Sequence, residues 1–109
     1  MIRAVAILSL LAVGACDQAS QAADQLARQS AKSAVTEALA TRFPAVPKQA
    51  ITPFTDCVID NSTAREITEF AKAAVVGVTD ATATQVRTVL GRAETQQCIF
   101  RAGLDALTA

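Results

Sequence analysis

The chain has 109 residues, 10 of them basic and 10 acidic, and it contains no histidine, tryptophan or tyrosine. This length fits one domain, and much of its apolar half is alanine, which favours helix but fills little core volume. The balanced charge argues against a nucleic-acid partner, and the absence of histidine removes the most common general base and metal ligand. We therefore expect one small domain that binds no nucleic acid, metal ion or cofactor.

The first sixteen residues form a segment of their own. Residues 1–3 include one positive charge, and residues 4–13 (AVAILSLLAV) include no charge. A membrane-spanning helix needs about 20 apolar residues, so this shorter run is typical of a signal peptide. The run ends in the sequence VGAC at residues 13–16. This sequence resembles the lipobox of bacterial lipoproteins, in which an aliphatic residue and two small residues precede a cysteine.

The resemblance implies that Cys16 receives a diacylglycerol on its sulfur, that residues 1–15 are removed, and that the new amino group is acylated. Two or more acyl chains anchor a protein stably. The chain would then lie on the periplasmic side of a cell membrane. Asp17 favours the inner over the outer membrane, as it does in lipoproteins of enteric bacteria. The alternative is a secreted protein cut after Ala15 by the ordinary signal peptidase, which also prefers small residues.

The cysteine count supports an oxidising compartment. Lipidation of Cys16 would leave Cys57 and Cys98 as an even pair, as expected outside the cytosol. A bridge between them would close a large loop and stabilise the fold by roughly 4 kcal/mol in the chain-entropy treatment. The two cysteines lack C-x-x-C spacing, and no histidine can act as their base. We interpret them as a structural disulfide.

The next segment has little to bury. Residues 17–33 are rich in alanine, glutamine and serine, and their only large apolar residue is Leu26. We interpret residues 16–33 as a lipidated cysteine and a tether, helical or frayed, and residues 34–109 as the folded domain.

The domain begins with two predicted helices. Apolar residues at 35, 39 and 43 form one stripe, and Pro44 ends that helix because the residue before a proline avoids helical angles. After a loop with three prolines, Thr52 and Pro53 resemble an N-cap and the first residue of a short helix. Its Phe54, Cys57 and Val58 share one face, so we expect Cys57 to be buried.

Three more helices are predicted. Thr63 and Glu66 fit a capping box that opens the strongest apolar pattern, which Gly77 ends. A further helix starts near Thr79, with a box-like pair at Thr82 and Gln85, and ends near Gly91. A last helix, residues 94–107, is apolar on two sides, one of them formed by Phe100, Leu104 and Leu107, which predicts burial between neighbours. The fold class is therefore an all-α bundle of four or five short helices linked by one disulfide.

Four acidic residues are candidates for chemistry. Asp56 and Asp60 would share one helix face, and Glu66 and Glu69 follow closely. Such carboxylates can bind Ca²⁺ or serve glycosidases. The EF-hand spacing is absent, however, and the chain has neither Trp nor Tyr to line a sugar site. We interpret the four as a solvated helix face, and we assign no catalytic residue.

These observations favour a membrane-tethered binding or structural module of the cell envelope that meets an envelope protein through an apolar patch or groove. Two alternatives remain open: a periplasmic holdase-type chaperone, similar in outline to small single-disulfide helical chaperones, and a small carboxylate-based enzyme.

Overall fold

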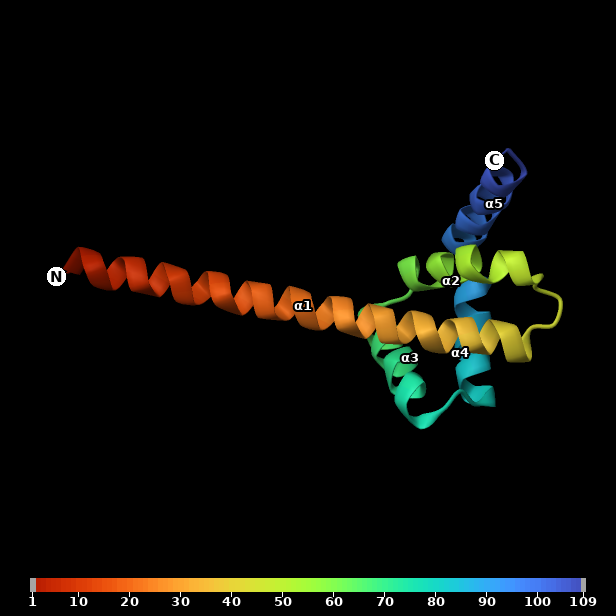
Figure 1. The fold of residues 1–109 in the computed structure, drawn as a ribbon, viewed down its shortest axis with the longest axis horizontal. Helices are drawn as coiled ribbons and strands as arrows, with labels where there is room; N and C mark the ends of the chain where they lie inside the picture. Colours follow the sequence, from red (N-terminus) through yellow and green to blue (C-terminus); the bar gives the residue numbers. More distant parts are fainter. Residues whose placement is uncertain (1, 109) are drawn as a thin grey trace.

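In a computed structural model, residues 2–108 are described, with side chains described for residues 22–103. This part of the chain folds entirely into helices and turns, which confirms the predicted all-α class. The leader and Cys16, on which the lipoprotein interpretation depends, lie outside the residues with described side chains. The elements are α1 (Ile2–Arg42), the 3₁₀ turn η1 (Lys48–Ala50), α2 (Ile51–Asp60), α3 (Ala64–Val76), α4 (Asp80–Leu90) and α5 (Ala93–Thr108) (Figure 1).

The C-terminal half of α1 forms the centre of the bundle. Figure 1 shows α2 on one side of this half, α3 on the other, and α4 crossing it. All three helices contact α1. Phe70 of α3 and Leu39 of α1 are the two largest fully buried side chains. Around them lie the other fully buried core residues of these helices, among them Ala31, Ala34, Val35, Ala38, Val58, Ile59, Val86 and Val89.

Packing of α1 begins earlier than the domain boundary expected at residue 34. Ala31 is fully buried, and Ala27 packs against the same core. On the flank of this stretch, Arg28 pairs with Asp60 at 3.0 Å and Lys32 with Asp56 at 3.2 Å. The sequence pattern missed these contacts because alanine gives a weak hydrophobic signal, although its small side chain lets two helices approach closely.

The start of α2 differs from its prediction, whereas α4 starts where the sequence predicted but with another capping pair. α2 begins at Ile51 with Ala50 as its N-cap, so Pro53 lies inside the first turn, where its missing N–H needs no partner. α4 is capped by Thr79, whose backbone N–H donates to Oγ1 of Thr82 at 3.1 Å. The predicted start near Thr79 is confirmed, but the pairing of Thr82 with Gln85 is wrong, because Thr82 is the partner of the N-cap Thr79.

The ends of α3 agree with the predictions. Thr63 is the N-cap, and its Oγ1 accepts a hydrogen bond from the Glu66 N–H at 3.2 Å. The Glu66 carboxylate accepts the Thr63 N–H in return at 2.8 Å. Gly77 ends the helix with φ of 110°, an angle that other residues rarely adopt. Gly91 ends α4, as predicted.

The last helix differs most from its prediction. None of the described α5 residues belongs to the hydrophobic core, and Phe100 is 68% exposed. Of these residues, only Thr95 is fully buried. Leu104 and Leu107, which were expected on the same side as Phe100, lie outside the residues with described side chains. The expectation of a helix buried between neighbours is therefore wrong for residues 93–103, and Figure 1 shows α5 projecting past α2.

Candidate functional site

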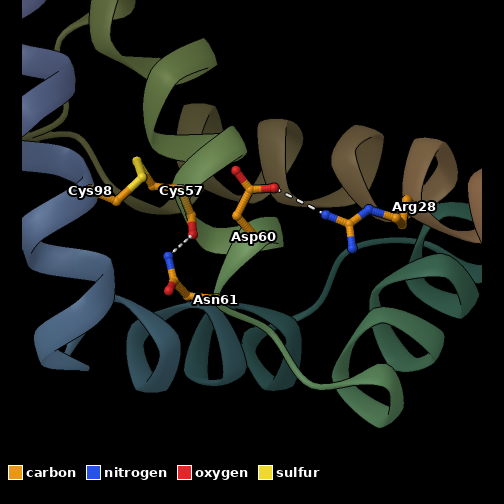
Figure 2. Close-up of a disulfide and its surroundings, with 5 residues drawn as sticks. All are labelled: Arg28, Cys57, Asp60, Asn61 and Cys98. Carbon is orange, nitrogen blue, oxygen red and sulfur yellow. Dashed lines mark hydrogen bonds and ion pairs between the residues drawn. A yellow bond between two sulfur atoms is a disulfide. The ribbon is translucent and has the colours of Figure 1, made fainter.

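A disulfide between Cys57 and Cys98 joins α2 to α5. The two sulfur atoms are 2.07 Å apart and the Cα atoms 5.6 Å apart (Figure 2). The pairing of these two cysteines is the one expected from the sequence. Cys57 is buried, whereas Cys98 is only partly buried. Nδ2 of Asn61 donates to the carbonyl oxygen of Cys57 at 2.8 Å, which closes the end of α2 beside the bridge. The bridge is therefore anchored firmly on the α2 side.

A groove of about 510 Å³ lies beside the disulfide, between α2 and α5. The two cysteines form part of its wall. Its other lining residues lie next to a cysteine in the sequence or about one helical turn from it, because residues i±3 and i±4 share a helix face. These residues are Pro53, Asp56 and Asn61 on one side and Glu94, Gln97, Arg101 and Ala102 on the other.

The groove offers polar contacts rather than covalent chemistry. Asp56 and Glu94 contribute carboxylates, Arg101 contributes a guanidinium, and Asn61 and Gln97 contribute amides. Its cysteines are in the disulfide, so neither is a thiol nucleophile. Residues 22–103 contain no group of three or more potential ligands placed to hold a metal ion. Groups of this kind can bind a polar peptide or a charged side chain through hydrogen bonds.

The four predicted carboxylates are directed to separate cations. Asp56 pairs with Lys32 and Asp60 with Arg28, whose side chain extends from α1 to the end of α2 (Figure 2). Glu69 lies 3.5 Å from Lys72, and Glu66 binds Arg92 at 2.8 Å. Only Asp56 lines the groove. The structure therefore places these carboxylates at four positions on the domain surface, rather than in one site.

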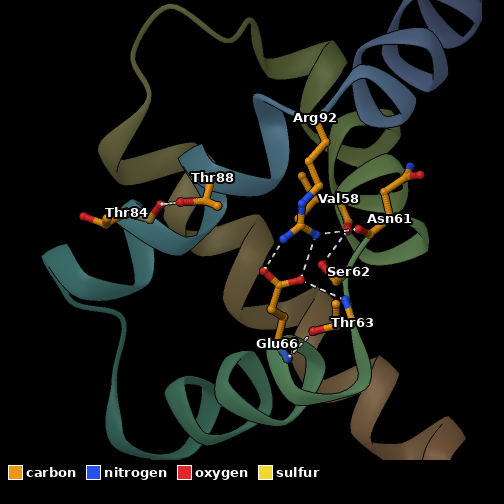
Figure 3. A network of polar contacts seen from close by, with 8 residues as sticks. All are labelled: Val58, Asn61, Ser62, Thr63, Glu66, Thr84, Thr88 and Arg92. Atoms are coloured by element: carbon orange, nitrogen blue, oxygen red, sulfur yellow. Dashed lines mark hydrogen bonds and ion pairs between the residues drawn. The ribbon is translucent and has the colours of Figure 1, made fainter.

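Glu66 is the centre of a polar network that connects three segments (Figure 3). Its two carboxylate oxygens each accept a hydrogen bond of 2.8 Å from Arg92, and Arg92 also donates to the carbonyl oxygen of Asn61 at 2.9 Å. The hydrogen bonds from Arg92 lower the pKa of Glu66. The same carboxylate raises the pKa of the Arg92 guanidinium. The network thus ties the link before α5 to the end of α2 and the start of α3.

Apolar side chains are exposed in two other places. On α5, Phe100 stands beside a hollow of about 390 Å³ whose residues are spaced i, i+3, i+4, i+7 and i+8, namely Ala93, Gln96, Gln97, Phe100 and Arg101. We call these five residues the outer face of α5. At the end of α3, Val75 and Val76 are 85% and 82% exposed. The exposure of the outer face was not predicted from the sequence, because the apolar pattern of this helix predicted that Phe100 is buried.

Comparison of the chain with sequence families, curated proteins and solved structures gives no match. Among the residues that the structure describes, no helix is both long and apolar enough to cross a bilayer.

Proposed function

We propose that this chain is a lipid-anchored binding module of the bacterial cell envelope. The lipobox-like sequence before Cys16 supports an anchor, and the disulfide between Cys57 and Cys98 suits an oxidising compartment. The proposed contact surface is the groove beside the disulfide together with the outer face of α5.

One observation bears most of this proposal: α1 leaves the bundle as a continuous helix whose residues 22–26 are all exposed. Among the residues with described side chains, the first that packs on the core is Ala27. At about 1.5 Å per helical residue, the stretch from Cys16 to Ala27 spans roughly 16 Å. Such a spacer would hold the bundle clear of lipid head groups and leave its surface free for another envelope protein.

The anchor is tested by the intact mass of the full chain isolated from membranes. We expect a chain that begins at Cys16 and bears acyl chains, and a Cys16→Ser variant that bears none. Cys98→Ser is the matched control, because it removes a thiol outside the lipobox and should leave the acyl mass unchanged. A chain that begins at Cys16 without added mass would support the secreted alternative and contradict the anchor.

The binding surface is tested with a photo-crosslinking residue at position 100, on the outer face of α5. The same residue at position 84 is the control, because Thr84 is exposed on α4 outside the proposed surface. We expect one reproducible adduct of defined mass from position 100 that is absent from position 84. Identical adducts at the two positions, or none at position 100, would contradict a partner at this surface.

A holdase-type chaperone is a second candidate, favoured by the exposed Val75, Val76 and Phe100 and by the acid-sensitive Glu66. Protonation of Glu66 would weaken the network around Arg92 and loosen the packing of α3. A holdase would then bind more of an apolar dye and suppress aggregation of a client protein at a pH below the ordinary pKa of a glutamate. A binding module would not suppress aggregation of the client, so this second response separates the two functions.

A further inference from the structure

Within residues 22–103, the disulfide is the one side-chain bond between α5 and another helix. The residues of the hydrophobic core within 22–103 all precede α5. In the same part of the chain, side-chain hydrogen bonds and ion pairs between helices join residues of α1–α4 or Arg92, and none comes from α5. Because the described residues of α5 pack on α2 without joining the hydrophobic core, the Cys57–Cys98 bond has a large share in keeping the helix docked.

Docked α5 leaves one buried polar group, the hydroxyl of Thr95, without a hydrogen-bond partner. Its side chain is fully buried, and its Oγ1 has no hydrogen-bond partner on the protein. A buried hydroxyl without a partner loses its hydrogen bond to water, which costs stability in the docked state. Movement of α5 away from α2 would return this hydroxyl to solvent.

The disulfide can be reached from solvent, since both cysteines line the groove between α2 and α5. Cys98 is the more exposed of the two, so an incoming thiolate meets its sulfur first. Just before α5, Arg92 is held by Glu66 and by the carbonyl oxygen of Asn61. The link before α5 would therefore stay in place while the helix itself moves.

We propose that α5 is a redox-controlled arm, released from α2 when a dithiol reduces the Cys57–Cys98 bond while the α1–α4 core stays folded. A thiolate of the dithiol attacks Sγ of Cys98, and the S–S bond breaks with Cys57 leaving as a thiolate that takes up a proton. The second thiol of the dithiol then displaces Cys98, which also becomes a thiol. Two electrons pass to the protein, and the dithiol becomes a cyclic disulfide.

Release changes the surface that the domain presents. The groove disappears because its two walls separate, and the Cys57 side of α2 becomes exposed. The outer face of α5 then moves independently of the bundle. This inference does not depend on the lipid anchor, because it follows from the contacts of α5 alone.

The test is hydrogen exchange of the full-length chain in detergent, with and without dithiothreitol and in the absence of denaturant. We expect exchange in α5 to accelerate by at least about tenfold on reduction, while exchange in residues 31–42 and α3 changes by less than about twofold. Unchanged exchange in α5 after complete reduction would overturn the proposal. Equal acceleration in α5 and the core would also overturn it, because the bond would then support the whole fold.

Thr95→Val supplies a second measurement that does not depend on removing a cysteine. It replaces the buried hydroxyl by a methyl group of similar size, so docked α5 should become more stable. In the reduced protein we expect exchange in α5 to slow by about threefold or more. Thr84→Val, on the exposed side of α4, is the control and should leave exchange in α5 unchanged. If α5 exchanges at the same rate in reduced Thr95→Val as in the reduced wild type, the buried hydroxyl of Thr95 does not weaken the docking of α5.

Discussion

The guanidinium of Arg92 donates two hydrogen bonds of 2.8 Å to the carboxylate of Glu66 (Figure 3). The same carboxylate accepts the backbone N–H of Thr63 and so closes the first turn of α3. One side chain therefore caps a helix and fixes the link between α4 and α5. Bidentate pairs of this kind are stronger than ordinary surface ion pairs because both partners are charged and their geometry is fixed.

Glu66→Gln should destabilise the fold in a pH-dependent way. The pKa of Glu66 is lowered in the folded protein, so its stabilising contribution is present above the ordinary pKa of 4.5 and is lost as the pH falls through the folded value. At pH 7 we expect a loss in unfolding free energy on the order of 1–2 kcal/mol. Denaturant titrations between pH 7 and pH 3 should show this difference shrinking on acidification.

Glu69→Gln is the matched control for that measurement. Glu69 is on the same helix, but its partner Lys72 lies 3.5 Å away and is mostly exposed. Its removal should change the unfolding free energy by less than about 0.5 kcal/mol. A Glu66→Gln deficit that stays constant from pH 7 to pH 3 would show that the charge of Glu66 is not what stabilises the network.

The two phenylalanines at positions 70 and 100 should lose very different amounts of stability on truncation. Phe70→Ala removes a fully buried ring and leaves a cavity among α1, α3 and α4, which should cost about 3–5 kcal/mol. Phe100→Ala removes a ring that is 68% exposed and should cost less than about 1 kcal/mol. Thermal or denaturant unfolding compares the two. Equal losses would show that Phe100 packs inside the domain.

Most of the helices could be predicted because their signals are local. The capping pair of Thr63 and Glu66 and the stop at Gly77 depend on neighbouring residues only, and both are found in the structure. The start of α2 was misplaced because Thr52 and Pro53 are compatible with either of two positions in a first turn. A local pattern fixes the type of element better than its first residue.

The candidate site was harder to predict because it depends on contacts distant in sequence. Nothing near Glu66 indicates Arg92 as its partner, and nothing near Phe100 indicates that α5 lacks a helix to cover that face. The residues that line the groove could be predicted from the sequence once the disulfide was expected. Residues one turn from Cys57 and Cys98 must surround the bridge, and Asn61 and Arg101 are two of them.

Gly77→Ala and Gly103→Ala should change stability in opposite directions. Gly77 has φ of 110°, and an added Cβ would meet no atom within 4 Å, so the cost is that of the backbone angle alone. We expect Gly77→Ala to destabilise by about 1–3 kcal/mol. Gly103 lies within α5, and a Cβ there also meets nothing, so alanine should raise the stability of α5 by about 0.5–1 kcal/mol. Circular dichroism during thermal unfolding measures the first, and hydrogen exchange in α5 the second.

The boundary between spacer and domain in α1 can be located with two matched substitutions. Ala31 is fully buried against the core, so Ala31→Leu adds volume that the packed helices cannot accommodate and should cost about 1–3 kcal/mol. Ala23 is exposed two turns earlier in the same helix, and Ala23→Leu should change the unfolding free energy by less than about 0.5 kcal/mol. Both substitutions keep a strong helix former, so helix propensity does not distinguish them. Denaturant unfolding of the two variants gives the comparison. Equally small losses of unfolding free energy would show that residues 27–33 belong to the spacer. A large loss for Ala31→Leu alone would show that the folded domain starts before residue 34.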